Sequence, residues 1–267
     1  MTTVNEPVWR TALSGAQILF VAFGATVLVP LLTGLNPSLA LLGAGVGTLI
    51  FQICTKREVP IYLGSSFAFI GPIIYSAKTW GMPATFGALA AVSLCYYLAA
   101  LLVKWRGVDF IHRLLPPVVI GPVVMVIGLG LARVAVEMAT GVAGGQQVVP
   151  YATALPVAAI ALLATMLTAI RARGLLKLVP ILVGVIVGYV VALALGLVDF
   201  SRVIAAPWFA LPDFGRPEFK WEAIMYMLPV AIAPIVEHVG GILAIGSVTG
   251  KDFTESPGLH RTLLGDG

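Results

Sequence analysis

Eight apolar stretches, separated by short polar or charged connections, divide the chain. A helix that crosses the roughly 30 Å hydrocarbon core of a bilayer needs about 20 predominantly apolar residues. Most of the eight stretches approach that length, so the pattern predicts an all-α polytopic membrane protein with about eight transmembrane segments. The predicted segments are Leu13–Leu32, Leu39–Cys54, Ile61–Ile74, Pro83–Val103, Pro117–Val136, Ala152–Ile170, Leu175–Leu197 and Ala223–Ile245.

The third segment is too short to cross as a helix. Residues 61–74 would span only about 21 Å at 1.5 Å per residue, and Pro60 and Pro72 interrupt the helical pattern at its two ends. Small and larger side chains alternate over residues 64–69, which predicts a short strand within a broken segment. Backbone outside a helix is tolerated at membrane depth where it lines a cavity, so this segment is a candidate binding site. A short tilted or re-entrant helix without a ligand role is the alternative.

Composition supports the membrane interpretation. The 267 residues are 59% hydrophobic and 10% charged, with a mean hydropathy of +1.01. Soluble domains are about 45–50% apolar and about 25% charged, so a water-soluble enzyme, a disordered chain and a disulfide-stapled secreted module are excluded. The two cysteines, Cys54 and Cys95, lie in apolar stretches and are expected to pack as small core residues.

The charge distribution predicts the orientation. With a cytoplasmic N-terminus, eleven of the 16 lysines and arginines fall in cytoplasmic connections, as the positive-inside rule requires. We therefore expect a multi-pass protein of the cytoplasmic (inner) membrane with its N-terminus in the cytoplasm. The net charge of +4 is explained by these connections, and no nucleic-acid partner is expected.

Glu237 is the candidate chemical group, because it is the only carboxylate well inside a predicted segment. A charge at that depth is expensive, so such a residue usually faces a cavity or a partner. Gly240 and Gly241 share its helical face and leave space beside it. Pro229 and Pro234 are expected to loosen the preceding helix. Burial favours the neutral form of a carboxylate, so Glu237 is also the candidate proton-coupling group. A structural role, paired with His238 or another helix, is the alternative.

Two further polar residues are weaker candidates. His238 is expected to pack or to bond another helix more readily than to touch a ligand, and Gln17 either faces the same cavity or bonds another helix. The sequence contains no His and Cys cluster with metal-ligand spacing and no nucleotide-binding or nucleophile motif. No metal, cofactor or enzymatic activity is expected.

Four stretches together resemble the uracil permease branch of the nucleobase–ascorbate transporter family. They occur in the family's order and spacing, and the resemblance runs the full length of the chain. The four stretches are Phe23–Pro30, Pro60–Ile70, Glu237–Gly240 and Pro257–Arg261.

The resemblance implies a fold of fourteen segments built as two inverted repeats of seven. Residues 1–114 would supply core-domain segments one to four, residues 115–200 gate-domain segments five to seven, and residues 201–267 an outer loop, segment eight of the core and the start of the next loop. Glu237 would bind the nucleobase and couple the proton, and Phe67 would supply a backbone contact. The secondary candidates are Ser66, Phe69, Gly241, Gln17 and His238.

The sequence departs from the family pattern in two ways. Some relatives carry histidine at the position of Gly241 and after the first-segment glutamine, where this chain has Ile18. The chain also stops at Gly267, after segment eight, so we expect an N-terminal fragment that is inactive alone.

The predicted function of the intact protein is proton-coupled uptake of a nucleobase, with uracil as the first candidate. The expected partners are the nucleobase, the proton and the lipid bilayer, and a homodimer is left open. The alternatives are a xanthine, urate or other purine permease, an uncoupled channel or facilitator, and a non-transporting membrane scaffold.

Overall fold

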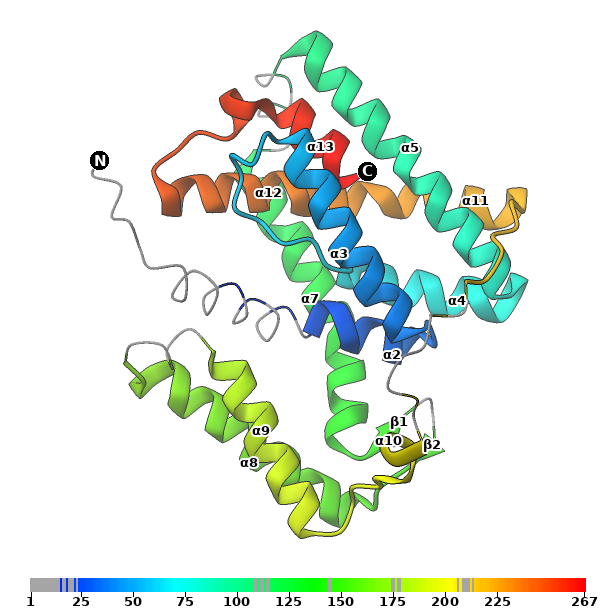
Figure 1. Cartoon of the computed structure of the whole chain (residues 1–267), viewed down its shortest axis with the longest axis vertical. Coiled ribbons are helices and arrows are strands. Elements are labelled where there is room, and N and C mark those ends of the chain that lie inside the picture. Colours follow the sequence, from blue (N-terminus) through cyan, green and yellow to red (C-terminus); the bar gives the residue numbers. More distant parts are fainter. Residues whose placement is uncertain are drawn as a thin grey trace. The chain divides into compact units, whose positions relative to one another are not determined.

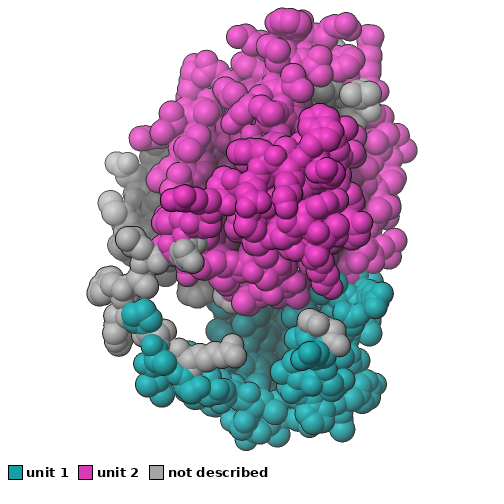
Figure 2. Space-filling view, turned by 90° about the vertical axis from the view of Figure 1, so that its right-hand side faces the viewer, with its two compact units in different colours: residues 1–24, 132–211 teal, residues 25–131, 212–267 magenta. Residues whose placement is uncertain are grey.

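The computed structural model describes residues 15, 18, 22, 24–107, 110, 113, 116–143, 146–173, 176, 179–205, 207, 212 and 214–267. Helices dominate this part of the chain (Figure 1), and the description below is confined to it. The chain divides into two compact units, residues 1–24 with 132–211 and residues 25–131 with 212–267 (Figure 2).

Five helical regions are long and apolar enough to cross a membrane. They are α3 (Pro37–Cys54), α5 (Met82–Arg106), Val118–Ala139 within α7 (Pro117–Ala139), α8 (Tyr151–Arg171) and the region Trp221–Thr249. They coincide with the second, fourth, fifth, sixth and eighth predicted segments. The chain is therefore a multi-pass helical membrane protein.

Within the described residues, the other three predicted segments do not form a helix long enough to cross a membrane. The first is described at 12 of its 20 residues, where the structure shows the π-helical turn Gly24–Leu28 and the start of α2 (Val29–Thr33). The seventh contains α9 (Pro180–Ala194), an apolar helix of 15 residues. The third is interrupted, with α4 (Ile70–Trp80) accounting for its helical part. The count of eight membrane-crossing helices and the fourteen-segment arrangement stay predictions.

The short strand predicted in the third segment is wrong for the described residues. Residues 60–66 carry no strand pairing, and Phe67–Phe69 form a single 3₁₀ turn before α4. Alternating side chains favour an extended backbone, but a strand also needs a hydrogen-bonded neighbour. The one sheet among the described residues lies elsewhere, where β1 (Val142–Ala143) pairs antiparallel with β2 (Gln146–Gln147).

Large apolar side chains cover much of the surface of the long helices. Leu49 and Ile53 on α3, Leu129 on α7 and Ile170 on α8 are each more than 60% exposed. In water such surfaces would be a liability, whereas acyl chains solvate them. The helices of each unit therefore bury only a narrow face against protein.

The unit of residues 25–131 and 212–267 holds the larger buried core. Helix α13 (Leu259–Asp266) packs against α3 and α5, and α5 also contacts α4 and α11 (Trp221–Met227). Phe51, Met227, Leu259 and Leu263 are fully buried there. The remaining helical elements of this unit are η4 (Leu228–Ala231), α12 (Ile232–Thr249) and η5 (Thr254–Gly258).

The other unit contains the pair α8 and α9, which pack against each other. Gly184 allows this approach, because a Cβ atom there would overlap the Thr165 hydroxyl oxygen. The short helix α10 (Ser201–Ala205) follows, with Asp199 accepting hydrogen bonds from the amide and hydroxyl of Ser201 at its start.

Candidate functional site

Side chains of α3 hold the extended part of the third segment in place of a neighbouring strand. The Gln52 amide donates hydrogen bonds to the carbonyl oxygens of Val59, at 2.9 Å, and Ile61, at 3.2 Å. One turn earlier, the Thr48 hydroxyl accepts a 3.0 Å bond from the Leu63 amide and itself donates to Ala44. Two side chains at i and i+4 on α3 therefore fix the path of residues 59–63.

The segment then presents unpaired backbone amides. Within the described residues, the N–H groups of Gly64, Ser65, Ser66 and Phe67 have no hydrogen-bond acceptor. Gly64 is exposed and the next three residues are half-buried, so these four consecutive donors are accessible to a polar ligand or to water.

Ser66 joins this segment to α12. Its side chain caps the 3₁₀ turn, with its oxygen 3.3 Å from the Ala68 amide nitrogen. The same hydroxyl donates a 2.7 Å hydrogen bond to Oε2 of Glu237. The bond spans 171 positions of sequence and brings the broken segment beside the carboxylate.

The two prolines before Glu237 act at different places. Pro229 lies in the 3₁₀ turn η4, where the helix between α11 and α12 is interrupted. Pro234 lies in the first turn of α12, which continues from η4 through helical backbone at Ala231 and Ile232, so its missing N–H leaves the preceding turn without one donor. The change from α-helix to 3₁₀ turn is at η4, about two turns before Glu237.

The two glycines after Glu237 also differ. A Cβ atom on Gly241 would meet nothing within 4 Å, and this residue lines the cavity. A Cβ on Gly240 would lie 2.9 Å from Cγ2 of Ile120 on α7. Our expectation of open space beside the carboxylate therefore holds at Gly241 and is wrong at Gly240, which permits close helix packing.

His238 faces α13. Its Nδ1 lies 2.9 Å from Oδ2 of Asp266, and its Nε2 lies 3.0 Å from the Thr262 hydroxyl. The His238 side chain is 6% exposed. Both ring nitrogens are thus engaged between helices, and the carboxylate of Glu237 bonds Ser66 rather than this histidine.

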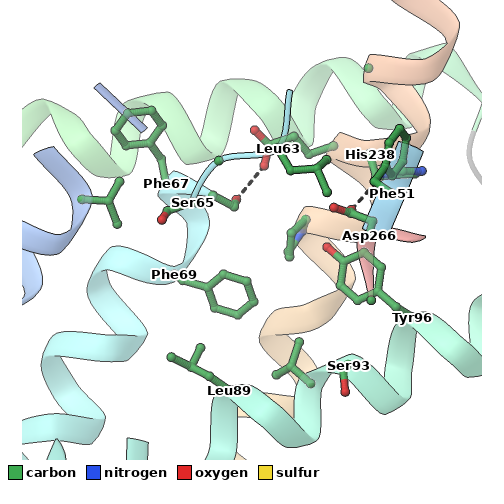
Figure 3. A pocket seen from close by; sticks show the side chains of 18 of the residues that line it. Phe51, Leu63, Ser65, Phe67, Phe69, Leu89, Ser93, Tyr96, His238 and Asp266 are labelled. Carbon is green, nitrogen blue, oxygen red and sulfur yellow. Dashed lines mark hydrogen bonds and ion pairs between the residues drawn. The ribbon is translucent and has the colours of Figure 1, made fainter. Parts of the chain in front are cut away.

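These groups surround a cavity of about 590 Å³ that lies wholly within the larger unit. Phe67, Phe69, Glu237, His238 and Gly241 line it together with Ser66. Figure 3 shows Phe69 and Tyr96 facing each other across it, with Leu89 and Ser93 of α5 along one wall. The volume is within the range of about 300–1,000 Å³ that is typical of small-molecule sites. Gln17 lies outside the described residues.

The polar groups of the cavity are suited to a small, flat, polar ligand. A carboxylate accepts hydrogen bonds, free amides donate them, and the aromatic side chains supply apolar surface. No group of three His, Cys, Asp or Glu side chains converges anywhere in the described parts of the chain.

In the part of the chain that the structure describes, His260 on α13 has a perturbed pKa, and it lies outside the membrane-spanning helices. Burial, with the positive charges of Arg261 and Lys104, lowers the pKa of His260 on α13. This residue is not among those lining the cavity.

Comparison with known proteins identifies the family. A family model described as "Permease family" matches residues 10–267. The chain belongs to this permease family. The resemblance predicted from the four sequence stretches is thereby confirmed, and membership agrees with a membrane transporter rather than an enzyme.

Individual relatives are similar over nearly all of this permease chain. It is 55% identical to "Probable uracil permease" of Pasteurella multocida, covering 100% of this chain and 65% of that protein. It is 51% identical to "Uracil permease" of Bacillus caldolyticus, covering 94% of this chain and 59% of that protein. It is 40% identical to "Uracil permease" of Escherichia coli K12, covering 98% of this chain and 61% of that protein. The chain thus spans less than two thirds of the length of these curated relatives.

Several residues of this cavity are not identified by the sequence pattern of the permease. Asp266 follows the last predicted segment and is expected in a connection, but α13 carries it back to the cavity. Tyr96 lies in a uniformly apolar helix, where nothing in its spacing marks it. Thr48 does not line the cavity, but it holds the third segment through the Leu63 amide. Thr48 and Gln52 are two polar residues on one side of an otherwise apolar helix. This pattern is the sequence signal that indicates a contact between α3 and another segment.

Proposed function

We propose that the intact protein takes up a nucleobase, uracil first, together with a proton across the cytoplasmic membrane. The observation that carries the proposal is the 2.7 Å hydrogen bond between Ser66 and Glu237, which sets a carboxylate beside the broken third segment. The names of the relatives, which are uracil permeases, support this choice of substrate.

The groups of the cavity complement the edges of uracil. The base carries two N–H donors and two carbonyl acceptors. Glu237 accepts from an N–H of the base, and a free amide among residues 64–67 donates to a carbonyl oxygen. The ring of Phe67 or Phe69 covers the face of the base.

Proton coupling is assigned to Glu237. The neutral acid and the base bind from the outside, the core domain moves against the gate domain, and both are released into the cytoplasm. In this scheme residues 1–114 and 201–267 belong to the core and residues 115–200 to the gate. The N-terminus is cytoplasmic, and assembly as a homodimer is part of the same proposal.

A purine permease is the second candidate, because a cavity of about 590 Å³ also admits a bicyclic base. Competition against labelled uracil separates the two. Uracil as the strongest competitor supports the first proposal, and stronger competition by xanthine or urate supports the second.

The test of the first proposal is Glu237→Gln in the intact protein. Uptake of labelled uracil is measured in cells or vesicles with an imposed proton gradient. Uptake is expected to lose its dependence on the gradient, because an amide neither binds nor releases the proton. Glu222→Gln is the matched control, since Glu222 is an exposed glutamate in the first turn of α11. Gradient-driven uptake at the wild-type rate in Glu237→Gln would refute the role.

A further inference from the structure

A tyrosine on the wall of the cavity has a free hydroxyl group. Tyr96 of α5 is only 8% exposed, yet it lines the cavity with Glu237 and Asp266. Within the described residues its hydroxyl has no hydrogen-bond partner, although no fully enclosed side-chain oxygen or nitrogen lacks one. The hydroxyl oxygen is therefore the part of this buried side chain that remains accessible.

The direction of the side chain explains that accessibility. Figure 3 shows the hydroxyl end of Tyr96 projecting away from α5 toward the space between Phe69 and Asp266. The neighbouring residue, Tyr97, is 42% exposed. Successive helical residues point about 100° apart, so one tyrosine of the pair faces the cavity and the other does not line it.

The other hydrogen-bonding groups assigned to the base lie on α12 and the third segment, so the Tyr96 hydroxyl is a potential donor from α5. Glu237 is an acceptor, and the free amides of residues 64–67 are donors on the opposite, third-segment wall. A planar base with two carbonyl groups accepts hydrogen bonds at two separated positions, and a tyrosine hydroxyl on α5 can donate to the carbonyl that faces away from the third segment. Among the cavity-lining residues of α5, Ser93 is the other one with a hydroxyl, and that hydroxyl already donates to Ala90 at 2.7 Å.

We infer that Tyr96 is a specificity-determining residue whose hydroxyl donates a hydrogen bond to one carbonyl oxygen of the nucleobase. The inference rests on the proposed function and adds to it a contact from α5. The site then recognises both the hydrogen-bond donors and the hydrogen-bond acceptors of the base. Glu237 recognises an N–H, and two donors on opposite walls recognise the two carbonyls. A base without a carbonyl at the Tyr96 position binds more weakly.

The experiment compares Tyr96→Phe with Tyr97→Phe in the intact protein. Each change removes one oxygen atom and keeps the ring, so packing is preserved. Affinities are measured for uracil, 2-thiouracil and 4-thiouracil, because sulfur is a much weaker acceptor than oxygen. For a hydrogen bond between neutral groups, Tyr96→Phe is expected to weaken uracil binding about 3- to 10-fold. Tyr97→Phe is expected to leave it unchanged.

The thio-analogues distinguish contact from packing. If Tyr96 donates to one carbonyl, the analogue with sulfur at that position loses less than about twofold on Tyr96→Phe, while the other analogue loses as much as uracil. Equal losses for all three ligands would show a merely structural role and overturn the inference, as would unchanged uracil affinity. Wild-type protein without affinity for uracil would instead refute the proposed function itself.

Discussion

Replacing Thr48 by valine tests how the third segment is held. Valine keeps the shape of threonine but removes the acceptor for the Leu63 amide and the bond from the hydroxyl to Ala44. Leaving a buried amide unpaired costs about 1–3 kcal/mol. Because Leu63 is only half-buried, the lower part of that range applies, about 1–2 kcal/mol. At 1.4 kcal/mol per factor of ten, the segment should open about 5- to 30-fold more often.

Hydrogen–deuterium exchange measures this opening directly. Peptides that cover residues 59–69 should exchange faster by that factor in Thr48→Val, because exchange follows the population of the open segment. Thr168→Val on α8 is the matched control. Its hydroxyl donates to Ala164 at 2.7 Å, as that of Thr48 donates to Ala44 at 2.6 Å, but within the described residues it bonds no other segment. Wild-type protection of residues 59–69 in Thr48→Val would refute the reasoning.

Three further predictions concern the cavity, the packing of α12 and the short helix α13. Ser66→Ala should weaken uracil binding about 3- to 10-fold, because the hydroxyl that holds the side chain of Glu237 in place is lost; an unchanged binding isotherm would contradict this. Gly240→Ala should lower the melting temperature of the purified protein, because its Cβ would meet Ile120 at 2.9 Å, whereas Gly241→Ala, with open space, should melt as wild type but bind ligand more weakly. His260 has a lowered pKa in the folded protein, so the unfolded chain takes up its proton first as pH falls. Stability should therefore decrease as pH drops through about 6.5, and the decrease should be smaller in His260→Gln by thermal denaturation.

Hydrophobic length was sufficient to place most of the long helices. The spans α3, α5, α7 and α8 and the region ending in α12 follow from apolar runs of membrane-spanning length. The interruption of the third segment also followed from length, because 14 residues cannot cross as a helix. These features are local, and a single segment of sequence contains the information that fixes them.

The particular side-chain contacts between distant segments were not predicted from the residues alone. The alternation over residues 64–69 suggested a strand, but the groups that hold the neighbouring backbone are side chains of α3. Glu237 was identified from the cost of a charge in lipid, whereas its partner Ser66 is 171 positions away. Gly240 and Gly241 are adjacent in sequence, and only the position of Ile120 separates their roles.

The attachment of the third segment to α3 has a consequence for insertions and deletions. Thr48 and Gln52 act together because four positions return to the same side of a helix. One residue inserted between them would turn Gln52 by about 100° and release the carbonyls of Val59 and Ile61. The spacing of these two residues should therefore tolerate no change in length, although lipid-facing positions of the same helix accept many apolar substitutions.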